Sequence, residues 1–230
     1  MEKISIIAPT YNERENLPIL VDRLFVDLKD YDIELIIVDD NSPDGTGKIA
    51  DELSQKDGRI SVVHRPRKMG LGSAFVDGTK VAKGEIFLLM DSDLSHDSKD
   101  FPKMLDKIEQ GYDMVIGSKY VPGGRTEDRL SRIAASRFFC LITSFVLWLN
   151  IKDSASGLFV IRKEMFKKVK LNPIGFKVMI ETAFKAKKFG CKITEVPVTF
   201  HKRKHGKQKG GFREAFRFIR LIFELRLGLR

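Results

Sequence analysis

Short apolar runs rich in β-branched residues alternate with longer amphipathic segments between residues 4 and 118. This alternation predicts β–α–β units, in which helices cover both faces of a largely parallel, Rossmann-like sheet. The predicted strands are Ile4–Ala8, Ile33–Val38, Ile60–His64, Ile86–Met90 and Met114–Gly117, and the predicted helices span residues 17–29, 46–55, 72–82 and 101–110. Ligands of such α/β sheets bind beyond the carboxyl ends of the strands, which predicts where a site should lie.

The pattern changes after residue 118, although no clear linker divides the chain. An apolar helix is predicted over residues 132–149, and the basic, glycine-containing segment 201–211 is predicted to be a mobile loop. The other predicted elements are a strand at Leu158–Arg162, a helix near 177–189, a strand at Lys192–Val198 and an amphipathic helix at Phe212–Leu227. We therefore expect a single domain over residues 1–230.

The composition is that of an ordinary globular protein, with 43% hydrophobic and 31% charged residues in a chain of 230. These fractions exclude a collagen-like, coiled-coil or wholly disordered chain. Cys140 and Cys191 lack the spacing of a zinc site or a disulfide framework. A reducing, cytosolic compartment is therefore the default expectation.

The formal charge of +10 is divided unevenly along the chain. Residues 1–118 carry a net charge of −8, residues 119–200 carry +10 and residues 201–230 carry +8. The basic half therefore faces an anion. This anion could be nucleic acid, a phosphorylated substrate or an acidic lipid surface, and charge alone does not choose among them.

Two observations bear on membrane topology. The uncharged part of the apolar helix, Phe138–Leu149, has 12 residues, against about 20 for a membrane-spanning helix, so we expect it not to cross. Met1–Lys3 runs directly into the first predicted strand and leaves no room for a secretory signal. Both observations favour a chain that stays in the cytosol.

Two acidic clusters follow predicted strands. Asp39 and Asp40 end the second strand, and Asp91-Ser92-Asp93 follows the apolar run Ile86–Met90. Two carboxylates that flank a small residue can reach one Mg²⁺ or Mn²⁺ ion, and these cations share oxygen ligands with substrate phosphates. The alternative is that Asp91 and Asp93 only cap the next turn.

These clusters form part of a longer series of motifs. The chain resembles the family 2 glycosyltransferases with the GT-A fold, and within them the dolichyl-phosphate (polyprenyl-phosphate) mannose synthases. The resemblance rests on Ala8-Pro9-Thr10-Tyr11-Asn12-Glu13, on residues 37–46 (IVDDNSPDGT) and on residues 90–96 (MDSDLSH). Later motifs extend it over nearly the whole chain: Gly70-Leu71-Gly72, Ser156-Gly157-Leu158-Phe159, Gly175-Phe176-Lys177, Glu195-Val196-Pro197-Val198, and Arg203 with Gly206 and Lys209.

The resemblance implies roles on the donor side of a site. Pro9, Tyr11 and Glu13 would line the nucleotide pocket, and Asp39 would contact the base or the ribose. The implied metal ligands, which would hold a divalent cation on the nucleotide diphosphate, are Asp91, Asp93 and, as the third, Ser95. The basic loop that would close over the diphosphate contains Arg203 and Lys209.

The resemblance also implies an acceptor side. Arg132 and Ser136 match positions that hold the acceptor phosphate. Lys119 stands where many relatives have arginine, so a point charge replaces a bidentate guanidinium at this position. The residues expected to act in catalysis are Asp93, Arg132 and Arg203. The implied reaction moves a mannosyl group from GDP-mannose to dolichyl or polyprenyl phosphate.

The chemistry of this reaction agrees with the residue types. A departing nucleoside diphosphate needs its negative charge stabilised, which a divalent ion and Arg or Lys side chains can do without proton transfer. The acceptor phosphate, with a second pKa of about 6, is already ionised at neutral pH and needs no strong general base. A one-step displacement would invert the anomeric carbon.

The predicted helices at 132–149 and 212–227 bear on whether the protein contacts a membrane. The first is apolar over more than one face, so it is buried, in a dimer, or partly in lipid. Together, the two helices suit a membrane interface, with cations toward lipid phosphates and aromatic rings toward acyl chains. We therefore expect a nucleotide-sugar half (residues 1–118), an acceptor half (119–211) and an interface helix (212–230), on the cytosolic face of a membrane and open to an anchoring subunit.

Other readings of the sequence stay open at this point. The donor could be UDP-glucose or another nucleotide sugar, because base identity is read largely by pocket shape. The run from Lys202 to Lys209 would suit a nucleic-acid-binding module, although the −8 half opposes a polyanion and no nucleic acid is expected as partner. A nucleotidyltransferase also pairs a metal with an α/β sheet, but gives the two apolar helices no role.

Overall fold

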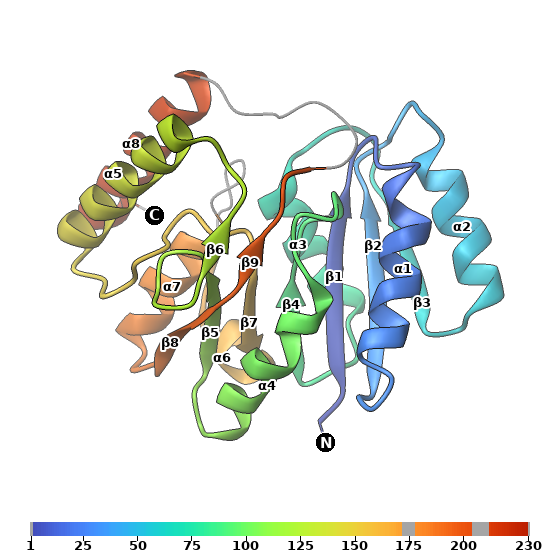
Figure 1. The fold of residues 1–230 in the computed structure, drawn as a ribbon. Helices are drawn as coiled ribbons and strands as arrows, with labels where there is room; N and C mark the ends of the chain where they lie inside the picture. Colours follow the sequence, from blue (N-terminus) through green and yellow to red (C-terminus); the bar gives the residue numbers. More distant parts are fainter. Residues whose placement is uncertain (1, 172–177, 204–211, 230) are drawn as a thin grey trace.

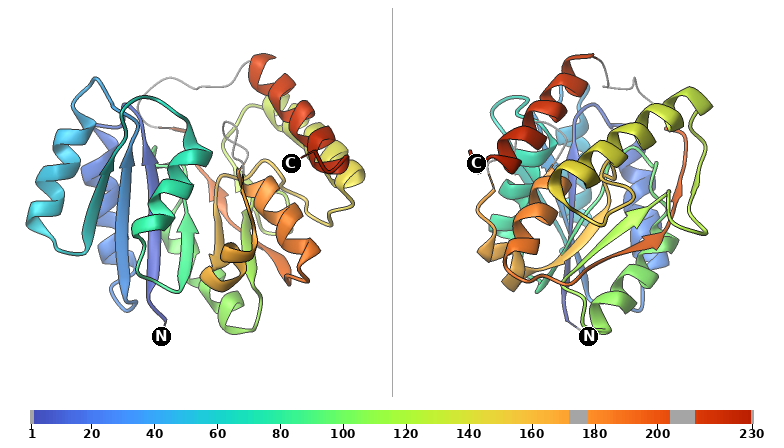
Figure 2. Two further views of the ribbon diagram at one scale, coloured as in Figure 1. Left: turned by 180° about the vertical axis from the view of Figure 1, so that it is seen from behind. Right: turned by 90° about the vertical axis from the view of Figure 1, so that its left-hand side faces the viewer.

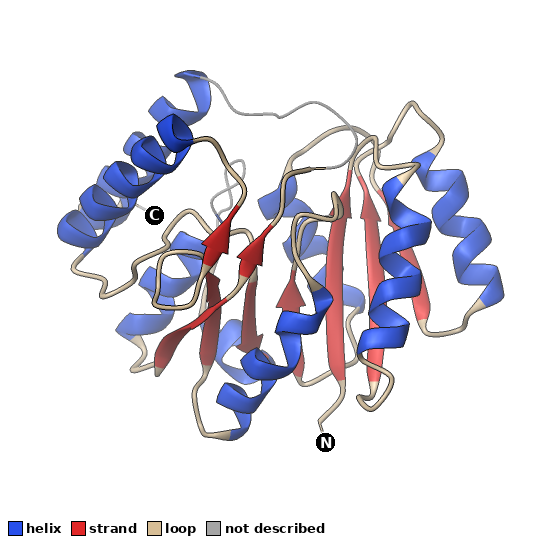
Figure 3. Ribbon diagram, viewed as in Figure 1, coloured by secondary structure: helices blue, strands red, loops and turns tan. Residues whose placement is uncertain are grey.

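The computed structural model describes residues 2–171, 178–203 and 212–229, and it contains a central seven-stranded sheet (Figures 1 and 3). The strand order is β3-β2-β1-β4-β7-β5-β8. The strands are β1 (Ile4–Thr10), β2 (Ile33–Asp39), β3 (Ile60–His64), β4 (Ile86–Leu89), β5 (Met114–Ser118), β7 (Phe159–Arg162) and β8 (Ile193–Pro197). Only β7 runs antiparallel to its neighbours, β4 and β5, in this sheet. The predicted α/β class with a mostly parallel sheet is therefore confirmed.

Helices cover both faces of this sheet because its central strands are apolar on both sides. All seven residues of β2 are buried, as are six of the seven in β1. Such continuous burial is typical of parallel strands between two helical layers. The helices are α1 (Asn16–Asp27), α2 (Thr46–Lys56), α3 (Leu71–Val81), α4 (Phe101–Glu109), α6 (Lys163–Lys168) and α7 (Val178–Lys188), with one 3₁₀ turn at Ser98–Asp100.

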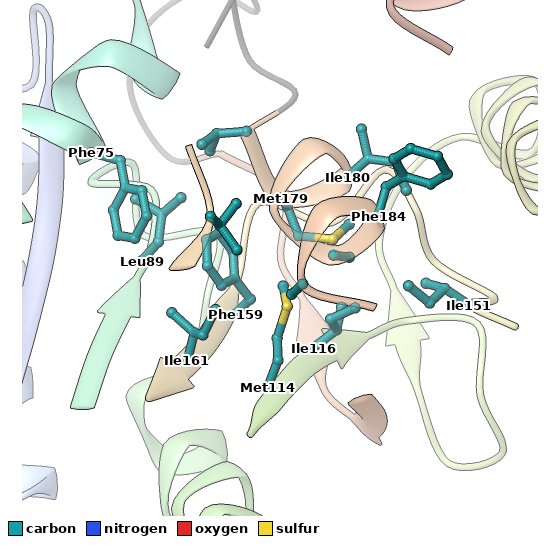
Figure 4. Packing of buried hydrophobic residues seen from close by; sticks show 14 of the residues in the cluster. Phe75, Leu89, Met114, Ile116, Ile151, Phe159, Ile161, Met179, Ile180 and Phe184 are labelled. Carbon is teal, nitrogen blue, oxygen red and sulfur yellow. The ribbon is translucent and has the colours of Figure 1, made fainter. Parts of the chain in front are cut away.

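The core is divided into two layers by the sheet. Ile6 and its neighbours pack against α1, α2 and α4 on one face. On the other face, Ile7 belongs to the cluster that includes side chains of α3 and α7, and this cluster is drawn in Figure 4. The rings of Phe75 and Phe159 meet edge to face there, with centroids 5.3 Å apart. The view from the side in Figure 2 shows the two helical layers.

The sequence did not reveal four elements of the described structure. Strands β6 (Arg125–Thr126) and β9 (Thr199–Phe200) pair in parallel outside the main sheet, although only two residues of each take part. The short helix α6 and the 3₁₀ turn were also not predicted. Of the predicted loop at 201–211, residues 204–211 lie outside the described residues.

Helices α5 (Leu130–Leu147) and α8 (Phe212–Arg226) lie side by side at one end of the molecule (Figure 1). The rings of Phe139 and Phe218 pack between them, with centroids 6.1 Å apart. On the outer surface of α5, Phe145 is 84% exposed and Leu141 is 70% exposed. Helix α8 buries Leu221 and Leu225 but exposes Phe223, so the pair has an apolar side that faces away from the sheet.

The length argument against a membrane-spanning helix does not hold for α5. That argument counted only the 12 uncharged residues from Phe138 to Leu149. The helix itself has 18 residues, because it begins at Leu130 and includes Arg132 and Arg137. By length and composition alone it is a candidate membrane span, and only 17% of it is buried in the described structure. Cys140 of this helix and Cys191 are both buried free thiols.

The close contact between α3 and the sheet gives a test of the fold. A Cβ atom added at Gly78 would lie 2.5 Å from Cγ2 of Ile7 and 3.1 Å from Cγ2 of Val38. Gly78→Ala is therefore expected to destabilise the protein by about 1–3 kcal/mol, despite the better helix propensity of alanine. Urea unfolding measures the change.

A matched glycine provides the control. No atom lies within 4 Å of the Cβ position at Gly58, so Gly58→Ala should leave the free energy of unfolding within about 0.5 kcal/mol of the parent value. Equal stability of the Gly78→Ala and Gly58→Ala proteins would contradict the described packing of α3 on the sheet.

Candidate active site

A cavity of about 290 Å³ opens at the carboxyl ends of β1 and β4. The chain moves outward from β1 to β2 and β3 on one side, and then returns to place β4 on the other side of β1. This reversal is the point at which open α/β sheets leave a crevice for ligands. The lining residues come from six parts of the chain: Pro9, Thr10, Tyr11 and Glu13; Asp40; Lys68, Gly70 and Leu71; Asp91, Ser92, Asp93 and Ser95; Asp128 and Arg132; and Phe200, His201, Lys202 and Arg203.

Asp93 lies at the centre of the polar network in this cavity. Its Oδ1 accepts hydrogen bonds from the backbone N–H of Ser95, at 3.0 Å, and from the Ser95 hydroxyl. Its Oδ2 accepts from Nε and is paired with Nη2 of Arg203, both at 2.7 Å. The turn is possible because Leu94 takes a left-handed conformation, with φ of 63°, and is anchored by its buried side chain. The Asp93 carboxylate is thereby fixed on both oxygens.

The charges around Asp93 are coupled. Burial alone would raise the pKa of the Asp93 carboxyl, but the Ser95 hydrogen bond and the charges of Arg203 and His96 outweigh it and lower this pKa. Burial would lower the pKa of the Arg203 guanidinium, but the adjacent Asp93 raises it. Glu13 adds a second negative charge, with Oε1 3.7 Å from Nη2 of Arg203. Asp93 and Arg203 are both charged in the neutral pH range.

Asp91 lies beside Asp93 with more of its carboxylate open to the cavity. Its Oδ2 is 3.4 Å from Nε2 of His96. A Cβ atom added at Gly157 would lie 2.8 Å from the same oxygen, so a larger residue there would displace the Asp91 carboxylate from this position. His96 is buried, and neither of its ring nitrogens has a hydrogen-bond partner among the described residues.

The carboxylates of Asp91 and Asp93 suit a hard divalent cation that takes its remaining oxygen ligands from a bound phosphate and water. Within residues 2–171, 178–203 and 212–229, no group of three His, Cys, Asp or Glu side chains is arranged to hold a metal. Two carboxylates, Asp91 and Asp93, are nevertheless what a Mg²⁺-type site requires when phosphates and water supply the other oxygens. The Ser95 hydroxyl, predicted as a third ligand, donates its hydrogen bond to Asp93.

Asp40 lines the cavity, whereas Asp39, for which the sequence predicted a nucleotide contact, is not among the lining residues. The Asp39 carboxylate accepts hydrogen bonds from the backbone and side chain of Ser42. Asp40 binds the buried Arg65 guanidinium at 2.5 Å and the backbone N–H of Gly70 at 2.8 Å. Asp40 therefore holds the loop before α3 against the end of β2.

Lys68, on that loop, is a cavity residue that the sequence did not single out. Its Nζ lies 3.8 Å from the centroid of the Tyr11 ring, which is a cation–π contact. Nothing in the local sequence distinguishes Lys68 from other surface lysines, because its position depends on the contact between Asp40 and Arg65. Pro9, Tyr11 and Glu13, which were predicted, line the same part of the cavity.

The predicted acceptor residues are only partly brought together. Arg132 lines the cavity and pairs with Asp128 at 3.3 Å. Lys119 is not a lining residue; its Nζ lies 3.0 Å from the buried Asp153 carboxylate. Ser136 is half-buried on α5 and also outside the cavity lining. Lys209 lies outside the described residues.

Comparison with known proteins places this geometry in a family. The family model described as "Glycosyl transferase family 2" matches residues 5–170. This chain belongs to glycosyl transferase family 2. The matched region of this family 2 chain includes β1, the acidic turn after β4 and Arg132, whereas Arg203 and α8 lie beyond it.

Curated relatives of this family 2 chain have related names. The chain is 41% identical over 226 residues to a dolichol-phosphate mannosyltransferase of Pyrococcus furiosus, which covers 97% of this chain and 63% of the relative. It is 36% identical over 216 residues to a polyprenol monophosphomannose synthase of Mycolicibacterium smegmatis, which covers 90% of this chain and 81% of the relative. The chain thus spans less than two thirds of the length of the first relative.

Solved structures show the fold of this family 2 chain. The mannosyltransferase PcManGT of Pyrobaculum calidifontis, in complex with GDP-Man and Mn²⁺, matches 99% of this chain and 63% of its own, with a TM-score of 0.68 and 17% identity. Glucosyl-3-phosphoglycerate synthase of Mycobacterium tuberculosis, with Mn²⁺, UDP-glucose and phosphoglyceric acid, matches 99% and 79%, with a TM-score of 0.69 and 19% identity. At these identities the likeness shows the fold alone, and the predicted GT-A fold is confirmed.

The pair of Asp93 and Arg203 in this family 2 site can be tested by titration. In Arg203→Met the pKa of Asp93 is expected to rise, because burial would no longer be opposed by the guanidinium. Carboxyl-detected NMR of aspartate measures it. A lowered pKa in the folded state stabilises the protein above the unfolded value of about 3.9, and this stabilisation is lost as the pH falls through the folded pKa. The variant should therefore lose less stability on acidification.

Arg220→Met is the control, since Arg220 is an exposed residue of α8 that pairs with Glu224 at 2.6 Å. It should leave the Asp93 titration unchanged. An unchanged pKa of Asp93 in Arg203→Met would contradict the described ion pair.

Proposed function

We propose that this chain is an inverting glycosyltransferase that moves a mannosyl group from GDP-mannose to dolichyl or polyprenyl phosphate. The observation that carries the proposal is that acids suited to a cation, Asp91 and Asp93, share one cavity with two arginines, Arg132 and Arg203. A transfer between two phosphorylated molecules needs both kinds of group. The names of the relatives that are 36–41% identical support the choice of sugar and acceptor.

A divalent cation, Mg²⁺ or Mn²⁺, is part of this proposal. Asp91 and Asp93 would hold it, with the diphosphate of the donor supplying further oxygens. When bound, the cation stabilises negative charge on the departing diphosphate. The Mn²⁺ complexes of two structures with the same fold support a divalent ion without choosing between the two metals.

The donor would occupy the part of the cavity formed by the end of β1 and the loop before α3. Tyr11 and Lys68 present a ring and a cation that suit a nucleoside and its phosphates. Arg203 lies beside Asp93 and Glu13 in the same cavity, where its guanidinium can hydrogen-bond a diphosphate as the sugar leaves. Charge stabilisation of this kind supplies much of the rate enhancement in group transfer.

The acceptor phosphate would enter beside Arg132, at the beginning of α5. One of its oxygens attacks the anomeric carbon, the new carbon–oxygen bond forms as the bond to GDP breaks, and the anomeric configuration inverts. Because the phosphate is already ionised, no group has to remove a proton from it. In this proposal Lys119 does not contact the acceptor directly unless its buried pairing with Asp153 changes.

Helices α5 and α8 would lie on the cytosolic face of a membrane. Phe138 and Phe145 of α5 and Trp148, the residue after it, are 62–84% exposed, and Arg132 of the same helix lines the cavity. Insertion of these aromatic side chains into the interface would bring the cavity to the depth at which a polyprenyl phosphate carries its head group. The same apolar surface is open to a membrane-anchoring subunit.

Asp93→Asn tests the proposed chemistry. The substitution keeps the size of the side chain and removes the charge, so mannosyl transfer from GDP-[¹⁴C]mannose to polyprenyl phosphate should fall by at least about 100-fold at saturating Mn²⁺. Extraction of labelled lipid into organic solvent measures the transfer. Asp106→Asn, at an exposed position of α4, is the matched control and should keep most of the activity.

Retained transfer in Asp93→Asn would contradict the role of this carboxylate. Transfer by the parent protein from UDP-glucose, with none from GDP-mannose, would keep the acceptor and the mechanism but replace the donor.

The membrane contact is tested with a triple variant, Phe138→Ser, Phe145→Ser and Trp148→Ser. Loss of three exposed aromatic side chains should weaken binding to anionic vesicles by at least about tenfold, because each contributes apolar area to insertion. Vesicle co-sedimentation measures it. Phe189→Ser removes an aromatic side chain that is 54% exposed after α7 and should have no effect. Equal binding by both proteins would exclude this face as the membrane contact.

A further inference from the structure

A short two-stranded sheet joins two chain segments that line the cavity. Strands β6 and β9 run in parallel, with Arg125 opposite Thr199 and Thr126 opposite Phe200. Figure 1 shows the pair beside the main sheet, between α5 and the strands that carry the acidic turns. The chain after β9 continues to Arg203, and the chain after β6 continues to Asp128 and Arg132. Residues just beyond both strands, Asp128 and Arg132 after β6 and His201, Lys202 and Arg203 after β9, line the same cavity.

Glu127, the first residue after β6, joins these two segments. Its backbone N–H donates to the carbonyl of Phe200 at 3.0 Å. Its Oε2 accepts a hydrogen bond from the backbone N–H of Lys202 at 2.8 Å, and its Oε1 lies 3.0 Å from Nδ1 of His201. One side chain thus binds two consecutive residues that immediately precede Arg203.

These contacts fix the origin of the Arg203 side chain. The N–H of His201 also donates to the carbonyl of Ser95 at 2.8 Å, which ties the same segment to the acidic turn. Arg203 then reaches Oδ2 of Asp93 at 2.7 Å. Asp128, another lining residue, follows Glu127 directly and pairs with Arg132. The Glu127 carboxylate therefore binds the residues just before Arg203. The chain that follows Glu127 leads to Arg132.

We propose that Glu127 is a positioning residue that sets Arg203 relative to Arg132, so that the donor and acceptor phosphates are held in line. The inference rests on the proposed function for the meaning of the two arginines. Glu127 does not itself line the cavity, so it touches neither substrate. A displacement of about 1 Å in a phosphate-binding group costs up to about 100-fold in rate, which is the scale on which such positioning acts.

The Glu127 carboxylate differs from that of an ordinary surface ion pair, because one of its partners is a backbone N–H. Its pKa is lowered by the hydrogen bond from the Lys202 N–H and, next, by that from His201, so the carboxylate accepts both bonds as an anion. Exposed pairs between two flexible side chains stabilise little because both chains must be ordered. Here one partner is a backbone N–H next to His201, whose own N–H is bonded to Ser95, so only one flexible side chain has to be ordered for this bond.

Hydrogen exchange on the free protein tests the contact without any substrate. In Glu127→Ala the amide of Lys202 loses its acceptor, so exchange at Lys202 should speed up by about tenfold or more. Glu127→Gln keeps one acceptor oxygen and should give an intermediate rate. Glu85→Ala is the matched control, because Glu85 is an exposed carboxylate that pairs with Lys163 at 3.1 Å. Unchanged exchange at Lys202 in Glu127→Ala would overturn the proposal.

A double-mutant cycle tests the functional half of the inference. Glu127→Ala should lower mannosyl transfer by about 10- to 100-fold, mainly in kcat, while Tm stays near that of Glu85→Ala. In the Arg203→Ala background the same substitution should have little further effect, because Glu127 acts through Arg203. An equal loss in both backgrounds, or no loss in either, would overturn the positioning role.

The two experiments separate this inference from the proposed function. If the parent protein transfers no mannose, the proposed function fails, and the donor found for the protein replaces GDP-mannose in the same cycle. Faster exchange at Lys202 with an additive cycle would show that the contact exists but does not position Arg203, which overturns the inference and leaves the proposed function intact.

Discussion

The parallel pairing of β1 with β2 on one side and with β4 on the other is the constraint on which the site depends. The register brings Thr10 beside Asp39, and the pairing of Ile7 with Leu89 ends β4 just before Asp91. Three loops must therefore leave the sheet at one edge. Each contains a left-handed residue, Asn12, Asn41 or Leu94, with φ between 57° and 63°. Backbone of this kind is typical of functional sites, where surrounding packing holds it in place.

In the folded protein, acidic residues of the first half and basic residues of the second half meet in one cavity. The acidic first half contributes Glu13, Asp91 and Asp93 to the cavity, and the basic second half contributes Arg132 and Arg203. Glu13 and Asp93 are buried, where an isolated carboxylate would be costly, and Arg203 compensates them. The same arginine would be needed by a diphosphate. In the proposed function, a phosphorylated donor would bind this site together with a cation, because each brings the charge that the other lacks.

Local sequence patterns predicted most of the fold but only part of the site. The seven strands of the main sheet match their apolar runs, since burial on both faces leaves a signal in each run. The direction of β7 and the pairing of β6 with β9 were missed because they depend on contacts between distant residues. In the site, Asp91 and Asp93 could be found because acids directly after a buried strand are conspicuous. The place of Asp40 in the cavity lining could not, because it depends on the contact with the distant Arg65, and the contact of Asp39 with a base or ribose stays a prediction.

The central claim is that the acidic turn after β4 and the arginines that share its cavity bind a nucleoside diphosphate through a divalent cation. A thermal-shift panel of GDP, UDP, CDP and ADP, each with and without Mn²⁺, tests it most directly, because a ligand of the native state raises stability by RT ln(1 + [L]/Kd). The account predicts a rise in Tm with GDP that requires Mn²⁺ and is lost in Asp93→Asn. A GDP-induced rise of equal size without the metal, or no rise with any nucleotide, would contradict it.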